Sequence, residues 1–202
     1  IGVVDHQAGS RDIRRLGPLH KQMPFTFAST CVAAASMAAI PPLFGFISKE
    51  SILTAFDATS FGPLLLAIAG LAALLTFIYS AKIVFGAFID GTKPMPHVTE
   101  APVALWLPAA LPGLTSLVLP FTLGWVDNPI NAGVRTITGD TEFHSHLALW
   151  HGLNAPFIVS LIVLVLGVCF VLFVRKPFFA AVENKQLLPT SGNDLLNAMV
   201  RG

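Results

Sequence analysis

The stretch "SMAAIPPLFGFISKESIL" (residues 36–53) interrupts a long apolar segment with two adjacent prolines, then with a lysine and a glutamate. Proline removes a backbone N–H donor and clashes with the preceding helical turn, so Pro41 and Pro42, with Gly45 close by, predict a broken helix. Backbone groups freed inside lipid need partners, and such a break is tolerated where the segment packs against protein or lines a wet cavity. We therefore expect the break to lie inside a helical bundle.

The composition is typical of a membrane protein. Hydrophobic residues make up 54% of the 202 residues and charged residues only 11%, against about 25% charged residues in a soluble domain. The mean hydropathy is +0.73. The net charge of +1 and the lack of a basic run interleaved with aromatic residues exclude a nucleic-acid-binding function. Cys31 and Cys169 lie in apolar runs, as expected for core or lipid-facing residues rather than a disulfide or metal ligands.

Four apolar windows approach the length of about 20 residues that a membrane-spanning helix needs. They are residues 24–46, 61–88, 101–125 and 156–174. The fold class that we predict is all-α: a polytopic integral membrane fragment with about four spans, the first a discontinuous helix. The chain begins without a methionine or a signal segment, and we interpret it as a piece of a longer polypeptide.

The distribution of basic residues predicts the orientation of the spans, because positive residues of short loops stay in the cytoplasm. The entry segment, the loop at 89–100 and the tail hold nine Lys and Arg residues, and the loop at 126–154 holds only Arg135. The nine are Arg11, Arg14, Arg15, Lys21, Lys93, Arg175, Lys176, Lys185 and Arg201. We therefore expect the loop at 126–154 to face outside.

Lys49 has two interpretations. In the first, Lys49 and Glu50 mark the outer interface, where a lysine extends its ammonium group to water. In the second, the broken helix keeps Lys49 at depth, where burial disfavours the charged form and a lysine serves as a proton carrier. Glu50 would then lower the cost of burial by pairing with Lys49.

The segment "HKQMPFTFASTCVAAASMAAIPPLFGFISKESIL" resembles the discontinuous late helix of the antiporter-like subunits shared by respiratory complex I and the Mrp cation/proton antiporters. In that family the lysine of "GF-x-SK-[DE]" lies on the central polar axis and communicates with a half-channel. The resemblance implies this role for Lys49. The glutamate–lysine pair and the middle lysine or histidine of the family lie on helices upstream of Ile1 and have no counterpart here.

Two further segments resemble the large A subunit of Mrp antiporters. "VVDHQAGSRDIRRLGPLHKQMP" is similar to "DHETGTRD-[IL]-x-x-LGGL", with "GPL" in place of "GGL", and "FHSHLALWHG" is similar to "FHLALWHG". The implied function is exchange of cytoplasmic cations, most often Na⁺, for external protons, by a complex of several subunits in the bacterial cytoplasmic membrane. No cofactor or covalent chemistry is expected, and the expected partners are the other antiporter subunits, lipid, Na⁺ and H⁺.

The resemblance also suggests a division of the chain. Residues 1–22 are expected to form a cytoplasmic connecting segment, and residues 23–100 the late helices of the antiporter-like unit, with a broken helix at 23–58 and a span at 61–88. Residues 101–179 are expected to hold further membrane helices, and residues 180–202 a cytoplasmic tail or linker.

Two other functions remain open. The chain would alternatively belong to a proton-pumping membrane subunit of complex I (NADH:quinone oxidoreductase) or of a membrane-bound hydrogenase, and so to an oxidoreductase. It would otherwise be a scaffold, in which the broken helix only packs against partner subunits. The phosphate-binding and hydrolase motifs of soluble enzymes do not occur in the sequence.

Several other ionisable residues have a structural and a functional interpretation. Lys82 is expected to extend to the headgroups at the cytoplasmic end of the second span, or to belong to a polar pathway. Asp57 is expected at the surface, or along an exit path beside Glu50. His144, His146 and His151, with Glu142, raise the question of a metal site, but their spacing does not favour convergent ligands, and we expect interfacial histidines instead. A role in tuning a response to pH is a secondary hypothesis.

Overall fold

The computed structural model describes residues 2–10, 12–91, 95, 97–142, 144, 147 and 152–184, without the side chains of residues 14 and 181–184. The regular structure of these residues is helical and includes no strand, which confirms the predicted all-α class. The chain divides into two compact units, Ile1–Gly167 and Val168–Gly202.

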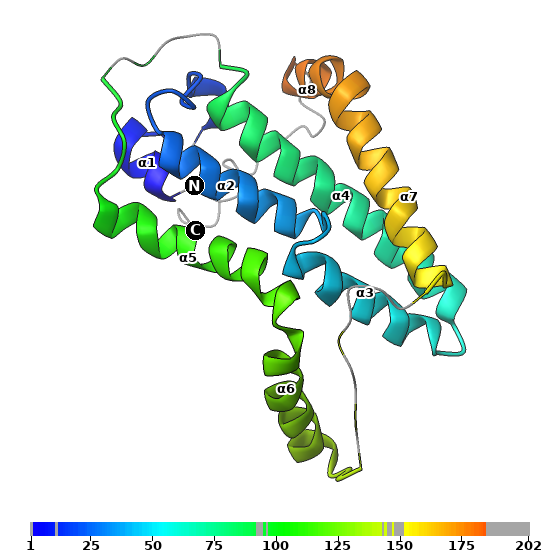
Figure 1. The fold of residues 1–202 in the computed structure, drawn as a ribbon. Helices are drawn as coiled ribbons and strands as arrows, with labels where there is room; N and C mark the ends of the chain where they lie inside the picture. Colours follow the sequence, from blue (N-terminus) through cyan, green and yellow to red (C-terminus); the bar gives the residue numbers. More distant parts are fainter. Residues whose placement is uncertain are drawn as a thin grey trace, which may run out of the picture. The chain divides into compact units, whose positions relative to one another are not determined.

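The predicted broken helix is present as two helices of 14 residues each, α2 (Pro24–Met37) and α3 (Phe44–Asp57). Residues 38–43 separate them and contain a cis peptide bond between Pro41 and Pro42. The short helices α1 (Gly2–Ala8) and η1 (Ile13–Arg15) precede α2 (Figure 1). Pro41 and Pro42 are exposed while Leu43 is buried, so the break packs against this chain on one side only.

Three helical segments have the length and composition of membrane spans. The first is α4 (Gly62–Phe88), and the second, Val103–Phe121, joins α5 (Val103–Val118) to η2 (Leu119–Phe121). The third, Ala155–Ala180, begins with α7 (Ala155–Cys169). With the shorter apolar helix α2, they give the protein its membrane-spanning architecture.

The segment expected as an external loop at 126–154 contains a helix, α6 (Leu123–Thr138), which ends at Gly139 with φ 72°. The dipeptide Asn128-Pro129 is typical of a turn, but here it lies inside an amphipathic helix. Asp127 and Asn131 are buried, whereas Ile137, on a different face of the helix, is 86% exposed. The Asp127 carboxylate accepts a hydrogen bond from the backbone N–H of Leu147 at 3.0 Å, so later chain covers the polar face.

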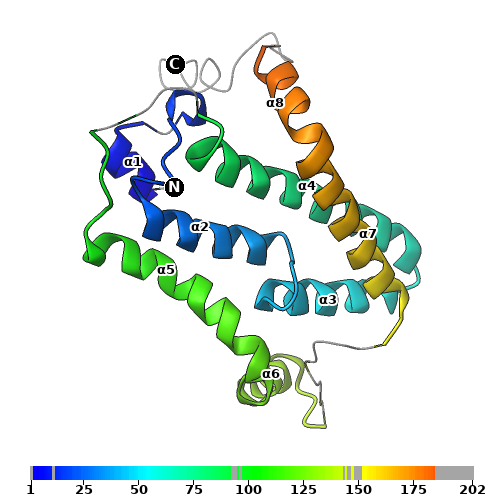
Figure 2. The same ribbon diagram turned by 45° about the horizontal axis from the view of Figure 1, so that its top comes forward.

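Within the first unit, α2 lies between α4 and α5 (Figures 1 and 2). Glycines allow α7 to approach α4 closely: a Cβ at Gly70 would lie 2.9 Å from Val159, and one at Gly167 would lie 2.6 Å from the Phe77 ring. A larger residue in place of Gly70 or Gly167 would therefore collide with the neighbouring helix.

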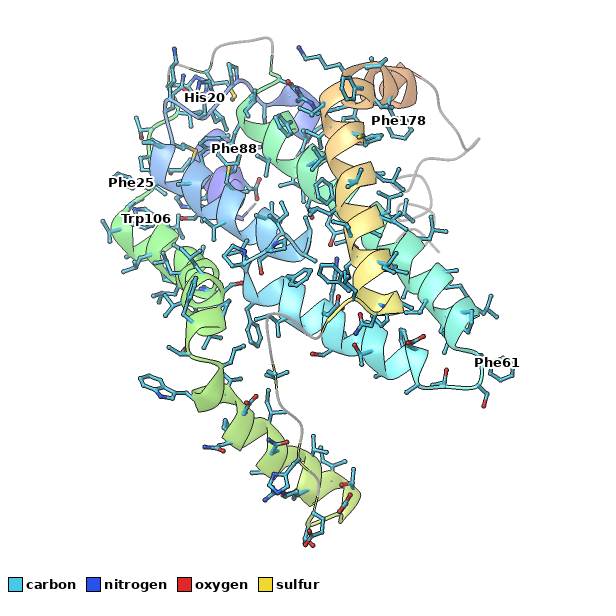
Figure 3. All side chains as sticks on the ribbon, turned by 45° about the vertical axis from the view of Figure 1, so that its right-hand side comes forward. His20, Phe25, Phe61, Phe88, Trp106 and Phe178 are labelled. Carbon is cyan, nitrogen blue, oxygen red and sulfur yellow. The ribbon has the colours of Figure 1, made fainter. Side chains whose placement is uncertain are left out.

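A buried apolar cluster lies where α1, the start of α2 and the end of α4 meet. Its members are Val4, Leu16, Leu19, Met23, Ala87, Phe88 and Val98. The Nδ1 atom of His20 lies 2.9 Å from the carbonyl oxygen of Phe88, and both residues are labelled in Figure 3. This cluster joins the predicted connecting segment at 1–22 to the membrane helices.

The second unit is helical up to residue 184. A π-helical stretch, η3 (Phe170–Val174), leads into α8 (Arg175–Asn184). The rings of Phe170, Phe178 and Phe179 pack with centroids 5.2–5.8 Å apart. The rest of the predicted tail lies outside the described residues.

Candidate functional site

The backbone at the end of α2 explains how the helix stops inside an apolar segment. The N–H of Ala39 bonds to the carbonyl of Ser36 at 3.0 Å, and the N–H of Ile40 bonds to that of Ala35 at 3.0 Å. These two bonds, with Ala39 at φ 57°, form a Schellman motif. The motif provides hydrogen-bond donors for the carbonyl groups of Ala35 and Ser36. The carbonyl group of Met37, in the same last turn of α2, needs a donor from elsewhere.

Lys49 supplies that donor. Its Nζ atom lies 2.9 Å from the carbonyl oxygen of Met37, which is on the other side of the break. The C-terminal end of a helix carries a partial negative charge, so an ammonium group is stabilised there. Lys49 is half-buried on α3, and its hydrogen bond joins α3 to the end of α2.

Gly45 allows the two half-helices to approach closely enough for this contact. A Cβ at Gly45 would overlap the carbonyl group of Ser36 and would lie 2.7 Å from its Oγ atom. The Ser36 hydroxyl in turn lies 2.6 Å from that of Ser116 on α5. Glycine at position 45 is therefore a steric requirement of the break.

The carboxyl group of Glu50 does not pair with Lys49, although the two residues are adjacent. Glu50 is only 3% exposed, and its Oε2 atom accepts a hydrogen bond from the Ser160 hydroxyl on α7 at 2.7 Å. Its Oε1 atom is buried without a hydrogen-bond partner among the described residues. Adjacent residues point about 100° apart around a helix, which directs Lys49 to α2 and Glu50 to α7.

Lys82 and Asp57 lie away from this site. Lys82 is half-buried on α4, six residues before the end of that helix. Asp57 is exposed at the last position of α3. Neither forms a hydrogen bond or an ion pair with Lys49 or Glu50 in the described part of the chain.

Two residues of this region were not assigned in the sequence analysis. Ser160 is the one hydroxyl-bearing residue in α7, and such an isolated polar residue in a span is the signal that would have identified it. Glu100 accepts hydrogen bonds from the N–H of Phe25 at 2.7 Å and from the Thr26 hydroxyl at 2.6 Å. It therefore caps the start of α2 from 75 residues away, and no local pattern reveals that.

A cavity of about 340 Å³ runs along α2 from Thr26 to Met37. Trp106 on α5 lines it near the start of α2, where its ring stacks on Phe25 with centroids 5.3 Å apart (Figure 3). Ser80 on α4 also lines the cavity, and its hydroxyl is buried without a hydrogen-bond partner in the described residues. A cavity of this size has room for several water molecules, and hydroxyl-bearing residues lie along its mainly apolar lining.

No cluster of three or more potential metal ligands occurs among the described residues. His144 contacts Arg135, with 2.9 Å between its Nδ1 atom and the guanidinium Nη2. His146 and His151 lie outside the described residues.

The chain is similar to known proteins over nearly its whole length. Residues 1–78 match the family model described as "NADH:quinone oxidoreductase/Mrp antiporter, TM". The A subunit of the Na(+)/H(+) antiporter of Alkalihalophilus pseudofirmus is 32% identical over 93% of this chain and 26% of its own length. The protein of the same name from Bacillus subtilis is 29% identical over 100% of this chain and 28% of its own length.

A solved structure shows the same similarity. A chain of the Mrp complex from Dietzia sp. DQ12-45-1b is 36% identical and aligns with a TM-score of 0.77, over 99% of this chain and 22% of that one. The present chain thus spans about a quarter of the length of its relatives. It is a membrane polypeptide that resembles the A subunits of Mrp antiporters.

Proposed function

We propose that the chain is part of a subunit of a multisubunit Na⁺/H⁺ antiporter, and that Lys49 takes part in proton translocation through its broken helix. The subunit would act as a transporter rather than an enzyme, with other antiporter subunits as partners, in the lipid of the bacterial cytoplasmic membrane. Antiporter A subunits match 93–100% of the chain, beyond the residues matched by the shared family model, which favours this function over a complex I subunit.

The observation that carries the proposal is the hydrogen bond between the Lys49 ammonium and the Met37 carbonyl. The bond is formed at the point where the helix is interrupted, so the break and the lysine form one feature. In surroundings of low dielectric, a change in the charge of Lys49 strongly alters its interaction with the negative end of α2 and with other buried charges. Loss and uptake of a proton would thereby change the contact between α2 and α3.

The cavity along α2 supports a route for protons to this point. It extends from Thr26, near the predicted cytoplasmic end, to Met37, whose carbonyl accepts the Lys49 hydrogen bond. Water held by the Ser80 hydroxyl and other polar groups would connect the two ends. In this proposal residues 23–100 belong to the antiporter-like unit, Glu50 is a second pathway residue, and Lys82 and Asp57 serve parts of the pathway away from the break.

The test compares Lys49→Ala and Lys49→Arg in the complete antiporter complex. Arginine retains the cation and the donors that bond to the end of α2, but it does not release its proton. We expect both variants to lose Na⁺-dependent proton flux in everted vesicles, and Lys49→Arg to leave assembly of the complex intact. Assembly would be followed by the amounts of the partner subunits.

The control is Lys21→Ala, which removes an exposed lysine that precedes α2. It should transport and assemble like the unmodified complex. Flux near the control level in Lys49→Arg would show that Lys49 only caps α2, and the proposal would be wrong.

A further inference from the structure

The contact between Glu50 and Ser160 joins two parts of the chain that lie 110 residues apart. Glu50 is 3% exposed, and burial of a carboxyl group is costly unless hydrogen bonds or a positive charge compensate. Its described partner is the Ser160 hydroxyl, which donates to Oε2 at 2.7 Å. This distance is the usual one for an O–H···O hydrogen bond.

The two carboxyl oxygens of Glu50 are therefore not equivalent. Ser160 occupies Oε2, while Oε1 is enclosed and has no hydrogen-bond partner in the described chain. The oxygen without a donor is the better site for a transferred proton, because protonation of Oε1 keeps the Ser160 bond in place. The serine thus holds one of the two oxygens and leaves the other without a donor.

Contacts between α7 and α4 hold the backbone of Ser160 in position. Val159, the preceding residue, contacts α4 at the position of Gly70, with 2.9 Å between the Val159 methyl and a Cβ built on that glycine. The Phe77 ring occupies the equivalent space at Gly167. These two contacts place α7 against α4 on either side of Ser160, so the backbone of α7 has limited freedom to follow the Glu50 carboxyl group if that group turns.

We propose that Ser160 is a positioning residue for proton transfer: it orients the Glu50 carboxyl group so that Oε1 accepts and releases the proton. This inference rests on the proposed function and extends it from the two halves of the broken helix to α7. It assigns the later membrane helix a direct part in the proton path.

The test uses four variants of the complete complex: Ser160→Ala, Ser160→Thr, Glu50→Gln and the double variant Ser160→Ala/Glu50→Gln. We expect Ser160→Ala to lower Na⁺-dependent proton flux roughly tenfold, the factor that corresponds to the loss of one buried hydrogen bond. Ser160→Thr retains the hydroxyl and should restore flux to within about twofold of the unmodified complex. In the Glu50→Gln background, Ser160→Ala should cause no further loss, because the residues act as one unit.

Thr115→Ala is the matched control, because Thr115 is an exposed hydroxyl residue of α5 whose hydroxyl, among the described residues, bonds to the carbonyl of Leu111 in its own helix. It should leave flux unchanged. Unchanged flux in Ser160→Ala, or an equal loss in the presence and absence of Glu50→Gln, would overturn the inference. Lys49→Ala, measured in the same vesicles, separates this result from the proposed function: flux lost with Lys49→Ala but retained with Ser160→Ala refutes only the role of Ser160.

Discussion

At the scale of single residues, α2 has charged side chains at both ends, each supplied by another part of the chain. Glu100 bonds to N–H groups of the first turn, and Lys49 bonds to a carbonyl of the last turn. Both placements match the helix dipole, which favours an anion at the N-terminus and a cation at the C-terminus. A helix of 14 residues is marginally stable alone, so these contacts contribute to holding it at its present length.

Glu100→Gln should destabilise the protein. Glu100 accepts hydrogen bonds from the N–H groups of Phe25, Thr26 and Ala101 and from the Thr26 hydroxyl. A glutamine offers one acceptor oxygen and turns an N–H₂ donor toward the remaining donors, so we expect a loss of about 1–2 kcal/mol. The Tm of the solubilised complex measures this, with Glu142→Gln, at an exposed glutamate, as the control. Equal Tm values for both variants would show that Glu100 does not stabilise α2.

At the scale of elements, the break depends on two small residues with different tasks. Ala39 has the left-handed backbone that ends α2, and Gly45 lets the first turn of α3 approach Ser36. Alanine in a left-handed conformation costs roughly 1–2 kcal/mol, whereas any side chain at Gly45 overlaps a backbone carbonyl. The contact at Gly45 is therefore the less tolerant of the two.

Gly45→Ala should separate the half-helices and lower the stability of the protein. The added methyl group meets the Ser36 carbonyl, and relief of that overlap moves Lys49 away from Met37. Overpacking of this kind costs about 1–3 kcal/mol, so we expect a lower Tm and reduced flux. Gly133→Ala on α6 is the matched control, since a Cβ there meets no atom within 4 Å. A Gly45→Ala complex as stable as this control would contradict the close approach.

The sequence predicted the features that depend on neighbouring residues and missed those that depend on contacts between distant residues. The break followed from Pro41 and Pro42, because a proline acts on the turn before it. The spans followed from local composition. The contacts of Lys49 and Glu50 join side chains to Met37 and Ser160 on other helices, and no local pattern shows which helices meet. Helix α6 was missed because residues 126–154 were interpreted as a loop between two spans; the hydrogen bond from the backbone N–H of Leu147 to the Asp127 carboxylate joins this helix to later chain.

At the scale of the whole molecule, the basic residues predict which side of the membrane each connection faces. Two exposed positions test this: Lys21, before α2, and Asp140, after α6. With Cys31 and Cys169 replaced by serine, we expect Asp140→Cys to react with a membrane-impermeant maleimide in intact cells. Lys21→Cys should react only after permeabilisation. Labelling of both from the same side would refute the predicted orientation.

The hydrogen bonds between Glu100 and the start of α2 make the broken helix dependent on residues far from it in the sequence. Residues Phe25 and Glu100 are 75 positions apart yet hydrogen-bonded, and Glu50 reaches forward to Ser160. Helices α2 and α3 alone, inserted into another membrane protein, would therefore lack the contacts that position Glu50 and the start of α2. A graft would need the following helix, the return of the chain to Glu100 and a replacement for α7, so the smallest transferable piece runs from residue 24 to residue 160.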